Sequence, residues 1–345
     1  MMHHRIGALL LGVFACLLLG FGGMAQGQLD IVTTTTDLKS LAEFVGGDLV
    51  QVDSIATGRE DVHMLAAKPS YMVRANRAGL WIRKGLEFEI GFEPLVLEGA
   101  RNPDIHVGRR GHLDASQDVR ILGVPTVPVD RSMGDVHPLG NPHYHLDPLN
   151  GRIMAETIAT RLRQLDPGNA DVYAANLERF QRDLDVSMFG EDAVEAIGGE
   201  QLWELKTRGE LESTLDDRDV SVGGWYASMR PYRGARIVTY HKSWTYFADR
   251  FNLEIVDELE SRPGIPPSSR HLAQLVQRIP AENVQLILME PFYSRRAPDL
   301  VSERTNIPVV EVGNSVNMQP EATNYITMFD NIISQFTAAL NELDA

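Results

Sequence analysis

The sequence predicts an α/β protein of two lobes, each with a parallel sheet flanked by helices, joined by one long bracing helix. In both halves of the chain, short β-branched runs alternate with apolar-periodic runs of helical length. This alternation is typical of parallel sheets that are covered on both faces. The chain has 345 residues, which is more than one hydrophobic core usually serves, so two domains are expected.

The first 27 residues predict a secretory signal peptide. A positively charged start precedes an apolar run over residues 6–21, and small residues follow up to Ala25-Gln26-Gly27. The apolar run is short for crossing a bilayer. We therefore expect cleavage after Gly27 and a periplasmic protein, with lipidation of Cys16 as an open alternative. Cys16 is the only cysteine, so a metal site in the mature chain must use His, Asp or Glu.

The N-terminal lobe is expected to span residues 28–149. It begins with a β-branched run over residues 29–36, and Asp37 then caps an apolar-periodic stretch over residues 38–45. This is a strand followed by a helix. The same alternation continues to residue 97, so the lobe is predicted to hold a parallel sheet.

Residues 150–190 are expected to form a linking helical segment between the lobes. Apolar residues recur there at helical spacing, at Tyr173, Leu177, Phe180 and Leu184. The next segment, residues 191–234, carries charge clusters with less regular patterning, and we interpret it as an inserted flap.

The C-terminal lobe is expected to span residues 235–345 and to repeat the α/β scheme. The pattern places its elements in chain order as strand 236–240, helix 243–251, strand 254–259, helix 268–277, strand 284–290, helix 297–305, strand 308–312 and helix 321–343. A second parallel sheet with helices on its faces follows from this order.

The charge of the chain bears on its partners. The formal net charge is −15 and the pI is about 5.1. Proteins that bind nucleic acids concentrate Lys and Arg on one face, so a nucleic-acid partner is not expected. A cationic ligand is easier to accommodate in an acidic protein.

Three histidines lie where ligands gather in open α/β sheets, in loops beyond the carboxyl ends of strands. They are His63 after strand 50–56, His241 after strand 236–240, and His143 just before the linking helical segment. Imidazole suits Zn²⁺, and three imidazoles leave one position for a carboxylate or water. A single histidine at a strand end is more often a hydrogen-bonded structural residue, so no one of the three would justify a metal site by itself.

Four groups of residues, in their order and spacing, resemble the substrate-binding proteins of bacterial ABC importers for zinc and manganese. The groups are Asp61-Val62-His63 with Lys68-Pro69-Ser70, Asn141-Pro142-His143 with Leu146-Asp147-Pro148, Tyr240-His241-Lys242-Ser243-Trp244 with Tyr246-Phe247, and Glu290-Pro291-Phe292-Tyr293. The resemblance covers nearly the whole mature chain. It implies that His63, His143 and His241 bind a metal between two α/β lobes.

The resemblance also bears on the choice of metal and on the fourth ligand. Members that take manganese usually have a carboxylate where this chain has His241, so the nitrogen donor favours zinc. An aspartate common in the family is replaced at Asn314, a poor zinc ligand. The fourth ligand is therefore expected to be Glu290, with water as the competitor. His145 and His137 are candidates for a supporting or transfer role.

The resemblance implies an extracytoplasmic binding protein that captures Zn²⁺ and delivers it to an ABC importer. The expected partners are the membrane permease and, as a further option, a periplasmic zinc chaperone, with the protein itself a monomer. The alternatives are a manganese- or iron-binding member, a zinc chaperone or adhesin, and a zinc hydrolase with Glu290 as base. No His-Glu-x-x-His helix or Ser-centred nucleophile elbow is found in the sequence, so we do not expect an enzyme.

Overall fold

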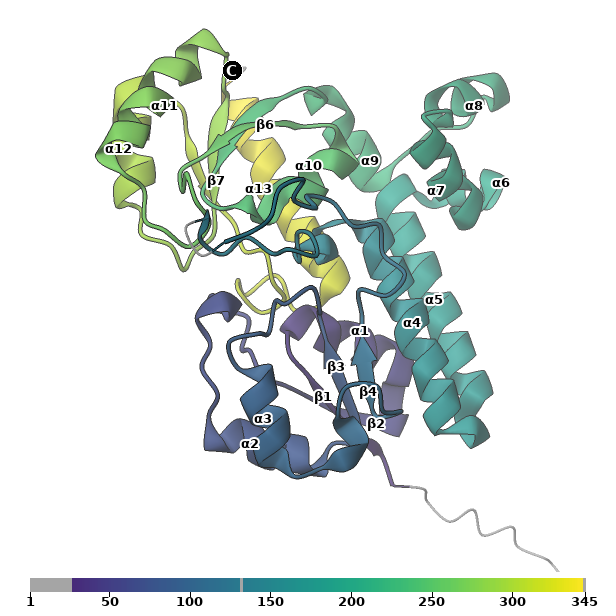
Figure 1. Ribbon diagram of the computed structural model, residues 1–345. Coiled ribbons are helices and arrows are strands. Elements are labelled where there is room, and N and C mark those ends of the chain that lie inside the picture. The colour runs from purple at the N-terminus through teal and green to yellow at the C-terminus, as the bar shows by residue number, and fades with distance from the viewer. Residues whose placement is uncertain (1–26, 131–132, 344–345) are drawn as a thin grey trace, which may run out of the picture.

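The computed structural model describes residues 27–130 and 133–343. The expected signal sequence up to residue 26, with Cys16, lies outside the described residues. Figure 1 shows two lobes, one from the first part of the chain (purple and blue) and one from the last part (green and yellow). The predicted two-lobe α/β class is confirmed.

The N-terminal lobe holds a four-stranded sheet in the order β2-β1-β3-β4, with every pair parallel. Its elements are β1 (Leu29–Thr33), α1 (Thr36–Gly46), β2 (Val50–Ser54), α2 (Pro69–Arg77), β3 (Leu80–Arg83), α3 (Glu93–Ala100) and β4 (His112–Asp114). Strand order reverses direction at β1, because β2 and β3 pair on its two sides. Parallel sheets bind ligands at such a switch point, beyond the carboxyl ends of the strands.

The C-terminal lobe repeats this topology in the order β6-β5-β7-β8, again with parallel pairs. Its elements are β5 (Arg236–Thr239), α10 (Thr245–Phe251), β6 (Glu254–Glu258), α11 (Ser269–Ala281), β7 (Leu286–Met289), α12 (Arg296–Thr305), β8 (Val309–Glu311) and α13 (Tyr325–Leu343). The switch point of this lobe is β5, and the chain continues from its carboxyl end into His241.

The linking segment is a pair of helices, α4 (Pro148–Leu165) and α5 (Ala170–Phe189), that pack against each other. Both also pack on α1 of the N-terminal lobe, and α5 packs against α9 (Gly224–Met229) as well. Figure 1 shows the pair running along one side of the molecule. Asp147 caps α4 by accepting a hydrogen bond from the Leu149 N–H at 3.0 Å.

Residues 191–234, which the sequence predicts as a less regular inserted flap, are largely helical. They contain α6 (Glu191–Ile197), α7 (Gly199–Arg208), α8 (Leu211–Arg218) and α9. Leu202, Trp203, Leu211 and Leu215 are buried there, so a narrow apolar stripe holds these short helices together. In Figure 1, α6 to α8 project beyond the end of α5.

One hydrophobic core runs through both lobes. It includes Leu41 of α1, Phe180 of α5, Leu288 of β7 and Phe329 of α13. A hydrogen bond from the Thr36 hydroxyl to the Val316 carbonyl, at 2.7 Å, adds a polar link between the lobes. The two switch points are therefore held facing each other by a shared core.

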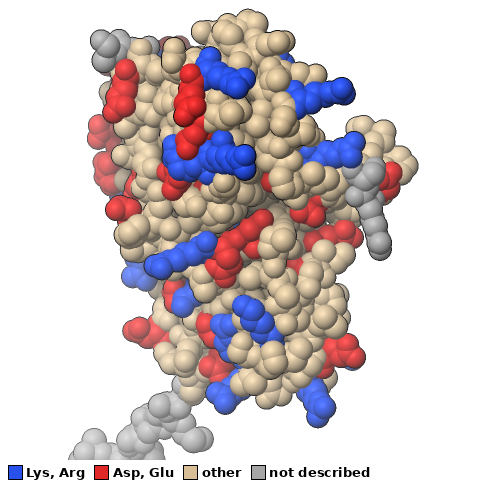
Figure 2. Space-filling model, turned by 90° about the vertical axis from the view of Figure 1, so that its left-hand side faces the viewer, with Lys and Arg blue, Asp and Glu red and all other residues tan. Residues whose placement is uncertain are grey.

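One face of the molecule carries mixed charge (Figure 2). Figure 2 shows basic and acidic side chains interspersed on one face of the molecule. Within residues 27–130 and 133–343, no helix is long and apolar enough to cross a membrane.

Candidate metal centre

His63 belongs to a short 3-10 turn, Val62–Met64, in the long loop after β2. Asp61 caps this turn, because its carboxylate accepts a hydrogen bond from the His63 N–H at 3.0 Å. The ring of His63 packs edge-on against Phe88, with ring centres 4.7 Å apart. The turn and the aromatic contact together orient the imidazole.

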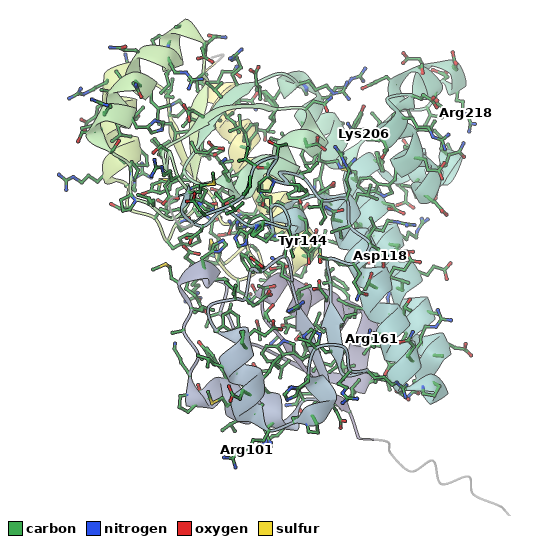
Figure 3. All side chains as sticks on the ribbon, viewed as in Figure 1. Arg101, Asp118, Tyr144, Arg161, Lys206 and Arg218 are labelled. Carbon is green, nitrogen blue, oxygen red and sulfur yellow. The ribbon has the colours of Figure 1, made fainter. Side chains whose placement is uncertain are left out.

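His143 lies at the start of another 3-10 turn, Tyr144–Leu146, directly before α4. Its N–H donates to the Asn141 side-chain oxygen at 2.9 Å. Tyr144 is fully buried and its hydroxyl donates to the Lys84 carbonyl at 2.6 Å. In Figure 3, Tyr144 lies where the two lobes meet. The turn that carries His143 is thus held by the N-terminal lobe.

The same turn is also held by the C-terminal lobe. The Arg250 guanidinium of α10 donates two hydrogen bonds to the Asp147 carboxylate, at 2.6 and 2.7 Å. Both side chains are buried, and bidentate pairing of this kind is the strong form of the interaction. His143 therefore has a position fixed by both lobes.

His241 follows β5, and its Nδ1 lies 2.9 Å from Oε2 of Glu260. A carboxylate only accepts, so Nδ1 carries the proton and Nε2 is left for a metal. Glu260 also accepts a hydrogen bond from the Gly264 N–H at 2.9 Å. Second-sphere carboxylates of this kind orient metal-binding histidines in proteins.

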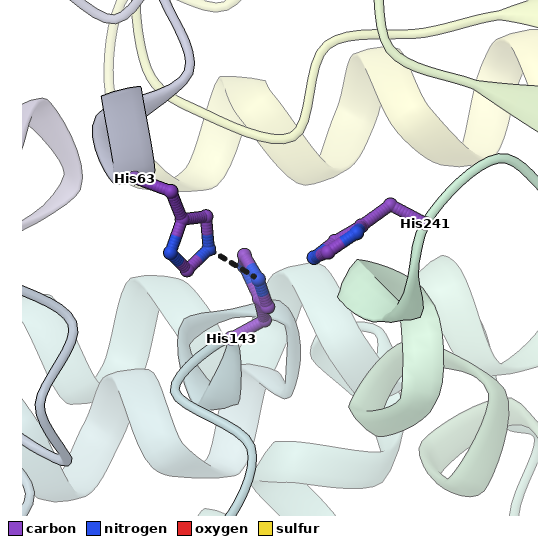
Figure 4. A group of neighbouring side chains, drawn as sticks. All are labelled: His63, His143 and His241. Atoms are coloured by element: carbon purple, nitrogen blue, oxygen red, sulfur yellow. Dashed lines mark hydrogen bonds between the residues drawn. The ribbon is translucent and has the colours of Figure 1, made fainter. Parts of the chain in front are cut away.

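The three predicted histidines form one group, in which one donor atom of each lies within 4.8 Å of the others. Figure 4 shows the rings pointing toward one another from three separate loops. Nε2 of His63 and Nε2 of His143 are 3.4 Å apart. Two nitrogens bound to one tetrahedral Zn²⁺ at 2.0–2.1 Å are about 3.3 Å apart. The spacing fits a shared ion without rearrangement of this pair.

Burial keeps two of the imidazoles neutral. It lowers the pKa of His63 and of His143 well below the usual value, and the neighbouring histidines and the Lys84 ammonium lower both further. Neutral imidazole is the form that binds metals. These two side chains are therefore in the metal-binding form at neutral pH.

The pKa of His241 moves in the opposite direction. Burial alone would lower it, but the hydrogen bond to Glu260 and the negative charge of Glu290 outweigh burial and raise the pKa. His241 must then release a proton from Nε2 whenever a metal binds at a pH below that value.

Glu290 follows β7 and is fully buried. Burial raises the pKa of its carboxyl to about 7, although the Ser243 hydroxyl and His241 favour the ionised form. Its Oε1 accepts a hydrogen bond from the Asn314 side-chain amide at 3.0 Å. Among the described residues, the donor atoms that lie close to one another belong to the three histidines. Glu290 is not a member of this group.

The remaining candidate histidines have separate partners. His145 is buried and bonds through Nε2 to the Asn314 carbonyl at 2.9 Å. His137 bonds through Nδ1 to the Leu86 carbonyl at 3.1 Å, with its ring centre 5.1 Å from that of His63. His137 thus borders the group, whereas the bonded nitrogen of His145 faces Asn314.

Two features of the site were not predicted from the sequence. Glu260 lies just beyond the end of β6, a position that could have suggested it. The second feature is an ion pair between Lys84 and Asp37, with Nζ and Oδ2 3.0 Å apart and both side chains 1% exposed. Lys84 also lies 5.2 Å from the centre of the Phe88 ring, so a buried positive charge borders the histidines.

The fold and the centre define a two-lobe binding protein with an imidazole cluster between its lobes. The family model described as "Zinc-uptake complex component A periplasmic" matches residues 31–187 and 221–339. The chain belongs to this family, the substrate-binding proteins of metal ABC transporters. Helices α6 to α8 fall in the unmatched stretch between the two segments.

Individual relatives are distant and differ in the metal that they are named for. The chain is 21% identical to the manganese ABC transporter substrate-binding lipoprotein PsaA of Streptococcus pneumoniae, over 97% of this chain and 96% of that protein. It is 26% identical to the iron-binding protein YfeA of Yersinia pestis, over 54% and 56%. A crystal structure of ZnuA superposes with a TM-score of 0.65 at 22% identity, covering 91% of this chain and 99% of the other.

Proposed function

We propose that this protein captures Zn²⁺ between its lobes with His63, His143 and His241 and delivers it to the permease of an ABC importer. The observation that carries the proposal is the convergence of three imidazoles from both lobes at a spacing that suits one ion. Family membership supplies the transport role, because substrate-binding proteins of this class work with a membrane permease and its ATPase.

The donor set favours zinc over manganese and iron. All three members of the group are nitrogen donors, whereas oxygen donors suit Mn²⁺. The relatives include proteins named for manganese and for iron, so the family alone does not select the metal. The choice of zinc rests on His241.

Three imidazoles leave the fourth zinc position open. The sequence predicts that Glu290 supplies the ligand at this position, with a water molecule as the alternative. Oε1 of Glu290 accepts the hydrogen bond from Asn314, whereas its Oε2 has no hydrogen-bond partner among the described residues and is the atom that would bind the ion. Asn314 itself is a poor donor to Zn²⁺, and its amide is already engaged by Glu290.

The wider organisation that we propose follows the sequence. A signal peptide over residues 1–27 directs the chain to the periplasm, lobes 28–149 and 235–345 flank the linking helical segment 150–190, and residues 191–234 are an insertion. We further propose a monomer that binds without catalysis and accepts zinc directly or from a periplasmic chaperone. The interpretation of this segment as an insertion is supported by helices α6 to α8, which the family model leaves unmatched.

Competitive titration of the metal-free chain 28–345 with Zn²⁺ and Mn²⁺ tests the proposal. We expect tighter binding of Zn²⁺, one ion per chain, and a melting temperature that rises with zinc by mass action. His63→Ala, His143→Ala and His241→Ala should each weaken zinc binding. Unchanged affinity in all three variants, or tighter binding of Mn²⁺, would contradict the proposal.

A further inference from the structure

Residues 133–140, which we call the strap, contact both lobes next to the histidine group. Its Asp135 N–H donates to the Pro263 carbonyl of the C-terminal lobe at 2.9 Å. Its His137 bonds through Nδ1 to the Leu86 carbonyl of the N-terminal lobe at 3.1 Å. The strap is therefore attached on both sides of the histidine group.

The hydrogen bond to Leu86 defines the tautomer of His137. A carbonyl only accepts, so Nδ1 carries the proton and Nε2 has a free lone pair. Nε2 is buried and has no hydrogen-bond partner among the described residues. An unpartnered buried acceptor is costly in native proteins, so this nitrogen has the form of an empty metal ligand, a property that it shares with Oε2 of Glu290.

The position of the His137 ring fits the same interpretation. Two imidazoles bound to one tetrahedral Zn²⁺ have ring centres about 5 Å apart. The ring of His137 is 5.1 Å from that of His63, and the three pairs within the group are 5.4, 5.8 and 5.6 Å apart. His137 thus contacts one member of the group, and its nitrogens lie outside the set of mutually close donors. His63, the member that His137 contacts, is also the most exposed of the three.

We propose that His137 is the fourth zinc ligand and closes the coordination shell from the strap through Nε2. This inference rests on the proposed function. Because the nitrogens of His137 lie outside the group of mutually close donors, the proposal requires the His137 side chain or the strap to move toward the ion when it binds. The fourth position is then filled by an imidazole instead of Glu290 or water, and binding of the ion joins the strap to both lobes.

His137→Asn is the test variant, because its amide nitrogen can replace Nδ1 at the Leu86 carbonyl while Nε2 is lost. His106→Asn, at an exposed loop histidine, is the matched control, and Glu290→Gln is the competing variant. Each is measured by competitive zinc titration, and by the visible spectrum of the Co²⁺-loaded protein, which reports the ligands directly.

We expect His137→Asn to weaken zinc binding on the order of 10–100-fold and to change the Co²⁺ spectrum, while His106→Asn matches the original protein. If His137→Asn matches the control in both measurements, or if only Glu290→Gln changes them, the inference is overturned. That result leaves the proposed function intact, because the proposed function depends on His63, His143 and His241. Failure of the unmodified chain to bind zinc would overturn the proposed function itself.

Discussion

His241 and Glu260 lie at the ends of adjacent strands of the C-terminal sheet, with Nδ1 and Oε2 2.9 Å apart. The carboxylate holds the proton on Nδ1 and turns Nε2 toward His63 and His143. It also explains why the pKa of His241 is raised although the ring is buried. Glu260 is therefore a positioning residue for the proposed zinc ligand.

Glu260→Gln should weaken zinc binding on the order of 10–100-fold, because the glutamine does not impose the tautomer and supplies no negative charge. Competitive titration measures the effect. Glu303→Gln, at an exposed position of α12, is the control and should leave the affinity unchanged. Equal affinities for the two variants would show that Glu260 does not act on the ligand.

Zinc binding should release a proton at mildly acidic pH. His63 and His143 are already neutral there because their pKa values are lowered, whereas His241 has a raised pKa and must lose its proton. Affinity should thus fall as the pH drops below the pKa of His241. Calorimetry in buffers of different ionisation enthalpy counts the protons released. A count of zero near pH 6 would contradict this assignment.

Glu290→Gln should stabilise the metal-free protein at alkaline pH. The folded-state pKa of about 7 exceeds the ordinary value of 4.5. The native carboxyl therefore stabilises fully below pH 4.5, and this contribution is lost as the pH rises through 7. Glutamine has no such dependence, so we expect the variant to gain roughly 2–3 kcal/mol at pH 8 relative to pH 5. Chemical denaturation with a chelator present measures it, and a pH-independent difference would refute it.

Asp37→Asn should destabilise the fold by roughly 3–5 kcal/mol, because it leaves the Lys84 ammonium buried without its partner. The double variant Lys84→Met with Asp37→Leu should recover most of that loss, since an apolar pair of similar volume needs no hydration. Denaturant unfolding of both variants checks the prediction. A double variant no more stable than Asp37→Asn would argue against the buried pair.

The three histidines could be predicted because His63 and His241 lie in loops after strands, His143 lies just before the linking helices, and the family motifs select all three. Glu260 could not be predicted as readily, because its contact with His241 depends on the pairing of β5 with β6. Such pairing depends on tertiary structure and leaves no local signal. The Lys84–Asp37 pair likewise joins the end of β3 to the start of α1.

The helices α6 to α8 could not be predicted from the local sequence pattern. Charged residues are frequent in residues 191–218, so the apolar stripe formed by Leu202, Leu205, Leu211 and Leu215 is narrow and the segment resembles a flap. Packing of the stripe against α5 and neighbouring helices stabilises it as helix. Most helical stability in proteins comes from such packing, which the sequence alone does not display.

A crystal structure of the zinc-loaded chain 28–345, with anomalous data collected at the zinc edge, tests the central claim most directly. The account predicts one zinc ion between the lobes, within 2.0–2.1 Å of Nε2 of His63, His143 and His241. An ion at another position, or a zinc-saturated crystal with no ion among these three histidines, would contradict it.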